Sequence, residues 1–252
     1  MSVLDRFSLA GKRALVTGAG RGIGRAIAIA FAEAGADLVL CARTRDDLEA
    51  VASDITALDR TAEIMVCDVT DIADFESKAQ DLRDIDIFCN NAGINRPKPI
   101  FEVTPDDYDA VMGINLRAAF FAARTMSIHM RDREIKGSII NMSSQMGHTG
   151  AANRTLYCAS KWGVEGLTKS LSIELGKLGI RVNTICPTFI ETPMTEPYFK
   201  DPNFKDYALS KIQLGRIGQV EDLIGAAVYL ASDASSLVTG SAVMIDGGWT
   251  AS

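Results

Sequence analysis

The feature of this sequence that most constrains its fold is the alternation of short apolar runs with longer segments of helical periodicity. The apolar runs are RALVTG, ADLVLCAR, AEIMVCDV, IDIFCNNAG, GSIINMSS, IRVNTICP and SAVMIDGG. Uninterrupted apolar runs of this kind are typical of strands in a parallel sheet that is buried on both faces. Segments of helical periodicity lie between them, at about 22–34, 45–57, 71–82, 106–132, 155–178 and 219–231.

Repeated alternation of strand and helix predicts a doubly wound α/β fold of the Rossmann type, with a mostly parallel seven-stranded sheet. No Pro- or Ser-rich linker or internal repeat divides the 252 residues, so we expect a single domain over 1–252. Only the segment 188–213 interrupts the rhythm, and it holds three of the seven prolines. Because ligands bind at the carboxyl ends of parallel strands, this segment is predicted to be a substrate lid.

Charge and cysteine usage narrow the class of protein. The 26 Lys and Arg against 32 Asp and Glu give a net charge of −6, so neither nucleic acid nor an anionic membrane is expected as a partner. No apolar run has the length of a membrane span, and the first residues lack the apolar core of a signal peptide. Five scattered cysteines without CxxC spacing and only two histidines predict no metal site and a reduced, cytoplasmic protein.

The stretch VTGAGRGIG joins the first predicted strand to the first helix. Its glycines permit a tight turn and a close approach to a pyrophosphate, and the helix that follows supplies N–H groups. The spacing does not fit G-x-G-x-x-G but fits T-G-x-x-x-G-x-G, with Thr17, Gly18, Gly22 and Gly24. The alternative is an ordinary tight strand–helix connection. The position directly after the first strand favours a dinucleotide site.

Residues at the end of the second strand are expected to contact the 2′ position of the adenosine ribose and so to distinguish NAD(H) from NADP(H). An acidic residue there would bind a free 2′-hydroxyl, but this strand ends in CAR, without an acid. Arg43 at that tip and Arg21 in the glycine turn suit a 2′-phosphate, which favours NADP(H) while NAD(H) stays possible. Alternatively, Arg43 is merely solvated. Asp68, after the third strand, either accepts from the adenine amino group or caps the helix that starts near Asp71.

Tyr157 and Lys161 lie four positions apart and therefore share one helix face. A free tyrosine has a pKa of about 10. A lysine charge ~5 Å away at an effective dielectric of ~20 favours the phenolate by about 3 kcal/mol, or about two pKa units. We therefore expect Tyr157 to act as a general acid or base tuned by Lys161.

Two further polar positions join this pair. Ser143 and Ser144 end the fifth strand, where a hydroxyl would hydrogen-bond a substrate carbonyl; Asn115, in GINLRAAF, would hold a water that relays protons to Lys161. Each has an ordinary alternative, a strand-end cap for the serine and a helix-interior contact for the asparagine.

Together these motifs resemble the short-chain dehydrogenase/reductase family over the whole chain. The matching motifs are TGxxxGxG at Thr17–Gly24, NNAG at Asn90–Gly93, the asparagine Asn115, the serine Ser144, YxxxK at Tyr157–Lys161, and DGG at Asp246–Gly248. The resemblance implies that Tyr157 is the acid/base, Ser144 positions the carbonyl, Lys161 holds the ribose and lowers the pKa of the tyrosine, and Asn115 maintains a water relay. The cofactor residues that it and the loops imply are Gly18, Gly20, Arg21, Gly22, Ile23, Gly24, Arg43, Asp68, Val69, Asn91, Ala92, Gly93, Tyr157, Lys161, Pro187, Ile190 and Thr192.

One position departs from the family pattern. The family has Pro-Gly after the sixth strand, whereas here Thr188 follows Pro187. Ile190 and Thr192 still occupy positions that contact the carboxamide in the family. The bulkier wall makes Thr188 and Phe189 candidate substrate contacts.

Substrate-facing positions are expected just after the strand ends, at Asn95 and Arg96, at Gln145 to His148, at Arg154 and in the segment 188–200. Of these, Arg96, His148 and Arg154 suit a carboxylate or a polyhydroxylated ligand. The alternative is that the arginines form surface or interface salt bridges. The stretch around Tyr157 resembles the gluconate 5-dehydrogenase and sugar-alcohol branches of the family, which implies oxidation of a secondary alcohol in a sugar acid, sugar or polyol. A 3-oxoacyl-thioester (acyl-carrier-protein) reductase is the alternative enzyme, and a catalytically inactive cofactor-binding sensor is the alternative of another class. The family also implies a homotetramer that packs through 106–132 and 155–178.

Overall fold

The computed structural model describes residues 2–251 and places all seven predicted strands in one sheet. Every pairing is parallel, and the strand order is β3-β2-β1-β4-β5-β6-β7, with crossovers on both sides of β1. This confirms the doubly wound α/β fold. The strands are β1 (Arg13–Thr17), β2 (Asp37–Ala42), β3 (Ala62–Val66), β4 (Ile87–Asn90), β5 (Ser138–Met142), β6 (Arg181–Pro187) and β7 (Ala242–Ile245).

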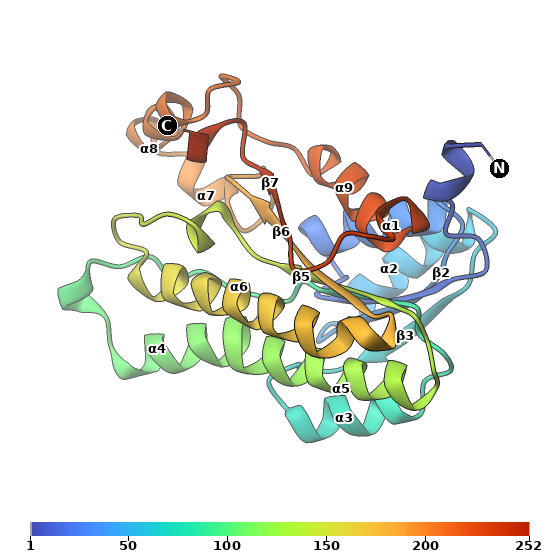
Figure 1. The fold of residues 1–252 in the computed structure, drawn as a ribbon. Helices are drawn as coiled ribbons and strands as arrows, with labels where there is room; N and C mark the ends of the chain where they lie inside the picture. The colour runs from blue at the N-terminus through green and yellow to red at the C-terminus, as the bar shows by residue number, and fades with distance from the viewer. Residues whose placement is uncertain (1, 252) are drawn as a thin grey trace.

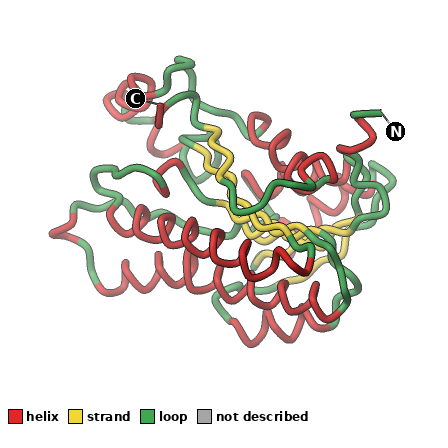
Figure 2. The backbone as a smooth tube through the Cα atoms, viewed as in Figure 1, coloured by secondary structure: helices red, strands yellow, loops and turns green. Residues whose placement is uncertain are grey.

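Helices cover both faces of the sheet, as Figures 1 and 2 show. One layer contains α1, α2 and α9, and the other contains α3, α5 and α6. The α-helices are α1 (Gly22–Glu33), α2 (Arg45–Thr56), α3 (Ile72–Gln80), α4 (Pro105–Met112), α5 (Ala119–Asp132), α6 (Thr155–Leu175), α7 (Glu196–Phe199), α8 (Pro202–Lys211) and α9 (Glu221–Ala231). Short 3-10 helices are η1 (Leu4–Phe7), η2 (Ile100–Glu102), η4 (Gln145–Gly147), η5 (Gly176–Leu178), η6 (Asp233–Ser235) and η7 (Trp249–Ala251).

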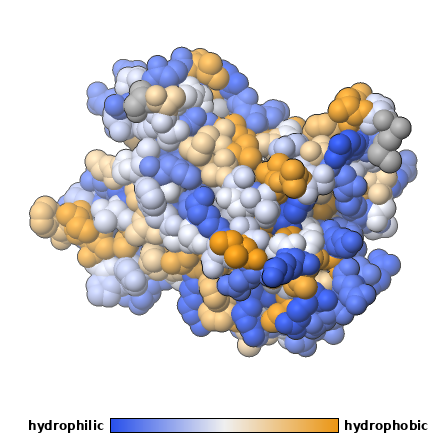
Figure 3. All heavy atoms as spheres, in the orientation of Figure 1, coloured by the Kyte–Doolittle hydropathy of each residue, from blue (hydrophilic) through white to orange (hydrophobic). Residues whose placement is uncertain are grey.

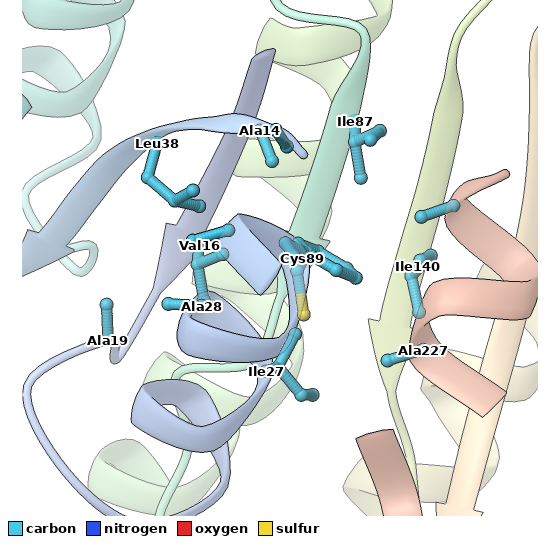
Figure 4. Packing of buried hydrophobic residues seen from close by; sticks show 14 of the residues in the cluster. Ala14, Val16, Ala19, Ile27, Ala28, Leu38, Ile87, Cys89, Ile140 and Ala227 are labelled. Atoms are coloured by element: carbon cyan, nitrogen blue, oxygen red, sulfur yellow. The ribbon is translucent and has the colours of Figure 1, made fainter. Parts of the chain in front are cut away.

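The apolar strands bury both faces because successive side chains point to opposite sides of the sheet. Val16 of β1 and Leu38 of β2 pack under α1 and α9, together with Ile27 and Ala227 (Figure 4). Leu15, the neighbour of Val16, packs on the opposite side with α3 and α5. Each face therefore has its own core, and the strands between them are held rigidly enough to position residues at their carboxyl ends.

Two predicted segments differ from the structure. The single helix expected over 106–132 is divided into α4 and α5 by the π-helical turn η3 (Gly113–Ala118), which widens the backbone for one turn. The segment 188–213, expected to break the rhythm, contains the short helices α7 and α8. No helix within residues 2–251 is long and apolar enough to cross a membrane.

Candidate active site

A cleft of about 490 Å³ opens at the carboxyl ends of the strands, between the glycine turn after β1 and the segment after β6. Sixteen of the seventeen predicted cofactor residues line it, and only Gly24 does not. The lining also includes residues that were not predicted to belong to the site: Ala42, Thr44, Asp47, Cys67, Ile94, Ile114 and Met142. Asn95 lines the cleft too, as do Pro193, Met194 and Thr195 from the predicted lid segment.

Backbone geometry shapes the glycine turn into a cradle. Gly18 has φ 66°, in the left-handed region that favours glycine, and a Cβ there would stand 2.9 Å from the Asn91 side-chain nitrogen. The Thr17 hydroxyl accepts hydrogen bonds from the backbone N–H groups of Asn91 (3.0 Å) and Ala92 (3.1 Å). Gly24 lies beneath the turn, where a Cβ would overlap the Gly18 carbonyl oxygen. This close-packed backbone, followed by the N-terminus of α1, fits a pyrophosphate.

The rim beside β2 and β3 is positively charged on one side. Arg43 and Arg21 both line the cleft, and the Arg43 side chain is 71% exposed with its Nη1 3.8 Å from Asp68 Oδ2. The Asp68 carboxylate also accepts from the Thr70 hydroxyl at 2.7 Å. The capping alternative for Asp68 is wrong, because Asp71 accepts the N-terminal N–H of α3 instead.

Ser144, Tyr157 and Lys161 meet at the end of β5. Tyr157 and Lys161 lie one turn apart on α6, and Lys161 Nζ is 5.5 Å from the centre of the Tyr157 ring. The buried Lys161 ammonium donates to the Met142 carbonyl oxygen at 2.8 Å, which holds it against the end of β5. The Ser144 hydroxyl accepts from the Met146 N–H at 3.1 Å, and all three candidate catalytic groups line the cleft.

The electrostatics of this pair differ from the sequence-based expectation. Burial raises the pKa of Tyr157 to about 12, while the Ser144 hydroxyl acts in the opposite direction. Burial lowers the pKa of Lys161 to about 8. The expected lowering of the tyrosine pKa by the lysine charge is therefore absent among the described residues, because desolvation dominates at both groups. At neutral pH the phenol keeps its proton and can donate it to a carbonyl oxygen.

Asn115 lies in the π-helical turn and does not line the cleft. Its side chain accepts from the Ile94 N–H at 2.8 Å, and donates to the Ile94 carbonyl at 2.8 Å and to the Ser160 hydroxyl at 3.2 Å. Asn115 thus joins the loop after β4 to the catalytic helix α6. Its predicted water relay to Lys161 stays a prediction.

The two predicted substrate residues after β6 face different surroundings. Thr188 lines the cleft, and its buried hydroxyl has no hydrogen-bond partner within residues 2–251. Phe189 does not line the cleft; its ring centre lies 5.1 Å from that of Phe204 and 5.6 Å from that of Trp249. Phe189 therefore anchors an aromatic cluster that supports the wall on the substrate side.

The three predicted basic substrate residues also lie outside the cleft lining. Arg96 Nη1 is 3.4 Å from the Asp107 carboxylate. The Arg154 guanidinium lies over the Tyr198 ring, 5.2 Å from its centre. The third residue is His148, whose Nε2 is 3.4 Å from Glu165 Oε1.

His148 belongs to a polar cluster between α6 and β6 that sequence reasoning missed. Cys186 Sγ lies 3.3 Å from Glu165 Oε1 and 3.5 Å from His148 Nε2, and the Thr184 hydroxyl donates to Glu165 at 3.1 Å. No motif spacing indicates this cluster, since its members come from three separate elements. Glu165 lies one turn beyond Lys161, so the cluster holds the catalytic helix against the sheet.

Asn95, one of the positions expected to face substrate, lines the cleft. It follows the NNAG motif, and its buried Oδ1 has no hydrogen-bond partner within residues 2–251.

A dinucleotide cradle at the carboxyl ends of a doubly wound sheet, with a tyrosine, a lysine and a serine beside it, defines a nicotinamide-nucleotide oxidoreductase. The family model described as enoyl-(acyl carrier protein) reductase matches residues 18–250. The chain belongs to the short-chain dehydrogenase/reductase family.

Similar proteins span the full chain. Gluconate 5-dehydrogenase of Gluconobacter oxydans (strain 621H) is 40% identical over 100% of both chains. L-xylulose reductase of Bos taurus is 39% identical over 96% of this chain and 98% of that protein. The crystal structure of a gluconate 5-dehydrogenase from Burkholderia cenocepacia J2315, in complex with NADP and tartrate, matches with a TM-score of 0.96 and 36% identity over 100% of both chains.

Proposed function

We propose that this protein catalyses reversible hydride transfer between NADP(H) and a secondary alcohol or ketone of a sugar acid, a sugar or a polyol. The observation that carries the proposal is that Tyr157 and Ser144 line the same cleft as Asn95 and Thr188. Asn95 Oδ1 and Thr188 Oγ1 are buried and have no hydrogen-bond partner within residues 2–251. Leaving a buried polar atom unpaired costs about 1–3 kcal/mol. A ligand rich in hydroxyl groups would satisfy both atoms, whereas an acyl chain would not.

The catalytic side chains supply proton transfer and orientation. When bound, the nicotinamide supplies or accepts the hydride. Tyr157 keeps its proton at neutral pH and donates it from Oη to the carbonyl oxygen in reduction, which leaves the phenolate. Oxidation is the reverse step: it starts from the phenolate form of Tyr157, whose Oη takes the proton of the alcohol. The Ser144 hydroxyl orients the substrate oxygen, and Lys161 is held beside the ring by the Met142 carbonyl.

The cleft supports NADP(H) more than NAD(H). The backbone from Gly18 to Gly22 would hold the pyrophosphate, and the guanidinium groups of Arg21 and Arg43 would bind a 2′-phosphate. The Burkholderia relative binds NADP, and its other ligand, tartrate, is a hydroxy acid. NAD(H) stays possible as a weaker cofactor.

A substrate screen with both reduced and oxidised cofactors tests this function. Sugar acids, polyols, their ketones and acetoacetyl thioesters are offered, and the nicotinamide absorbance is followed. We expect turnover of a polyhydroxylated substrate, and a loss of about 10²–10⁴-fold in kcat for Tyr157→Phe because the general acid is removed. Tyr229→Phe, on the distant helix α9, is the matched control.

Two results would replace the proposal. Turnover of the acetoacetyl thioester alone would identify a 3-oxoacyl-thioester reductase, which shares acyl-carrier-protein chemistry with the matching family of enoyl-(acyl carrier protein) reductases. NADPH binding without turnover of any substrate, and no difference between wild type and Tyr157→Phe, would identify a cofactor-binding sensor.

We further propose that the segment 188–213 acts as a lid. Its first part, from Thr188 to Thr195, forms one wall of the cleft, and α7 and α8 continue it away from the sheet. Ile190 belongs to the core under α1 and α9, whereas Phe189, α7 and α8 pack in a small separate cluster. The part of the segment that contains α7 and α8 therefore suits movement over a substrate.

We also propose a homotetramer that packs through α4, α5 and α6. A groove along these helices is lined by apolar side chains including Met112, Leu116 and Leu167. Tyr108 and Phe120 in the same groove are each about half exposed, and Figure 3 shows further apolar surface on the projecting loop before α4. Light scattering at micromolar concentration should report four chains; a fully active monomer would contradict the assignment.

The cysteines support a reducing compartment, and we propose the cytoplasm. All five are free, and Cys41, Cys67, Cys89 and Cys186 are buried. Cell fractionation would test this location, and recovery of the protein outside the cytoplasm would contradict it.

A further inference from the structure

The first turn of the catalytic helix holds a buried cation without a counter-ion. Arg154 is only 8% exposed, and its Nε has no hydrogen-bond partner within residues 2–251. Across the same residues no Asp or Glu oxygen lies within 4.0 Å of its guanidinium, although many other arginines form such pairs. Burying an unpaired charge is costly, so the position of Arg154 calls for an anionic partner.

The other basic residues on the substrate side already have partners. Arg96 and Lys98 both contact the Asp107 carboxylate, at 3.4 and 2.6 Å. His148 contacts Glu165 at 3.4 Å. Of the three basic residues predicted to contact substrate, only Arg154 keeps its hydrogen-bond donors free.

An aromatic ring of the segment after β6 lies beside this cation. The Arg154 guanidinium carbon lies over the ring of Tyr198 in α7, 5.2 Å from the ring centre, and a cation–π contact of this kind uses none of the N–H donors. The N–H donors lie in the plane of the group and stay free for a carboxylate.

The position of Arg154 along the chain places it close to the catalytic tyrosine. It is the N-cap residue of α6 and precedes Tyr157 by three residues. Burial raises the pKa of the Tyr157 phenol, and the positive charge of Arg154 acts in the opposite direction with a smaller effect. Asn153 before it has φ 59°, and its carbonyl accepts from the Lys98 N–H at 3.0 Å, which fixes the turn into the helix.

We infer that Arg154 binds a carboxylate of the substrate and makes this enzyme select sugar acids over neutral sugars and polyols. The inference rests on the proposed function and narrows its substrate class. The carboxylate binds in the plane of the guanidinium beside Tyr198, so the wall segment and α6 hold the acid together. The carboxyl end of the substrate is then fixed, and one secondary alcohol along its chain meets Tyr157.

The test compares substrates that differ only in charge. Aldonic acids and the alditols of the same carbon skeleton are oxidised with NADP⁺, and kcat/KM is measured for each pair. We expect the wild type to prefer the acid by at least about tenfold, because charge-assisted hydrogen bonds are stronger than neutral ones. Arg154→Gln should raise the KM for the acid about 30-fold and leave alditol kinetics within about twofold.

Controls separate recognition from folding. Arg154→Lys keeps the positive charge but lacks the planar pair of guanidinium N–H donors, so it should retain part of the preference for aldonic acids over alditols. Arg131→Gln, an exposed arginine on α5 paired with Asp132, should change neither substrate class. The affinity for NADPH of each variant reports whether the cofactor half stays intact.

The outcomes distinguish this inference from the proposed function. If the wild type uses alditols as well as aldonic acids, or if Arg154→Gln weakens both equally, the carboxylate role is wrong while the polyol or sugar activity stands. If neither class is oxidised, the proposed function fails, and the inference fails with it.

Discussion

The two halves of the cleft are built in different ways. The cofactor half is formed by backbone and glycines at the ends of β1 and β4, where Gly18 is locked against Asn91. The substrate half is formed by side chains from distant segments: Ser144 follows β5, Tyr157 lies on α6 and Thr188 follows β6. A local sequence motif is enough to specify the backbone geometry of the cofactor half. The side chains of the substrate half come together only when the fold brings distant segments into contact.

This difference explains which half specifies chemistry and which specifies substrate. The cofactor half tolerates little change, because an added Cβ at several glycines would meet backbone or a fixed side chain. The substrate half is supported by the small aromatic cluster around Phe189. We therefore expect substitutions in the first half to affect folding and all reactions, and those in the second to affect particular substrates.

The largest effect is expected at Gly24. In Gly24→Ala the new Cβ would overlap the Gly18 carbonyl oxygen and lie 2.5 Å from the Asn91 side-chain nitrogen. We expect a loss of about 4 kcal/mol in the free energy of unfolding and at least ~100-fold weaker NADPH binding. Urea denaturation and fluorescence titration measure both.

Gly225→Ala in α9 is the control for this substitution, since no atom lies within 4 Å of its new Cβ. Helix propensity predicts a gain of up to about 1 kcal/mol there. Equal effects of the two substitutions would show that the glycine turn is not specially constrained.

The next largest effect is the dependence of the free energy of unfolding on pH, which we assign to Lys161. Burial lowers its pKa in the folded protein to about 8, from 10.5. Between these values the unfolded chain binds more protons, so the free energy of unfolding should rise as pH increases from about 8 to 10, by up to about 3 kcal/mol. Tyr157, with its pKa raised to about 12, opposes this only above about pH 10.

Lys161→Met should remove that rise. Urea denaturation of both proteins at several values between about pH 7 and 10 is the measurement. Parallel curves for wild type and variant would mean that Lys161 is not desolvated as the structure indicates.

A smaller effect is expected at the charged rim of the cofactor half. Arg43→Ala should weaken NADPH binding about 30-fold, close to 2 kcal/mol, and leave NADH binding nearly unchanged, because only the 2′-phosphate loses a partner. Arg45→Ala is the matched control: it is exposed, two residues away, and pairs with Glu49. Equal loss for both cofactors would assign Arg43 to another role.

The smallest effect is expected in the wall of the substrate half. Phe189→Leu removes edge contacts with Phe204 and Phe199, worth about 1 kcal/mol, and should raise the substrate KM about fivefold with unchanged NADPH affinity. Phe101→Leu, at the 99% exposed η2 position, should change neither quantity. A larger effect on NADPH than on substrate would remove the distinction between the two halves.

Much of the fold and of the cofactor half could be predicted because their signals are local. The apolar runs predicted all seven strands, and the glycine spacing and the NNAG motif predicted where the dinucleotide cradle lies. The π-helical turn at Asn115 was missed, since its extra residue leaves the helical pattern of polar and apolar positions almost unchanged. The contact between Glu165 and Cys186 was missed because the two residues are brought together from separate elements, 21 positions apart in the chain.

Residue period and motif spacing are local properties, and they specify the doubly wound sheet, the dinucleotide turn and the shared helix face of Tyr157 and Lys161. The electrostatics of that pair depend instead on packing from several elements, because burial raises the pKa of Tyr157 and lowers that of Lys161. Tertiary packing also decided which basic side chain is free. Arg96 lies beside the Asp107 carboxylate and His148 beside the Glu165 carboxylate, whereas Arg154 has no carboxylate beside it within residues 2–251.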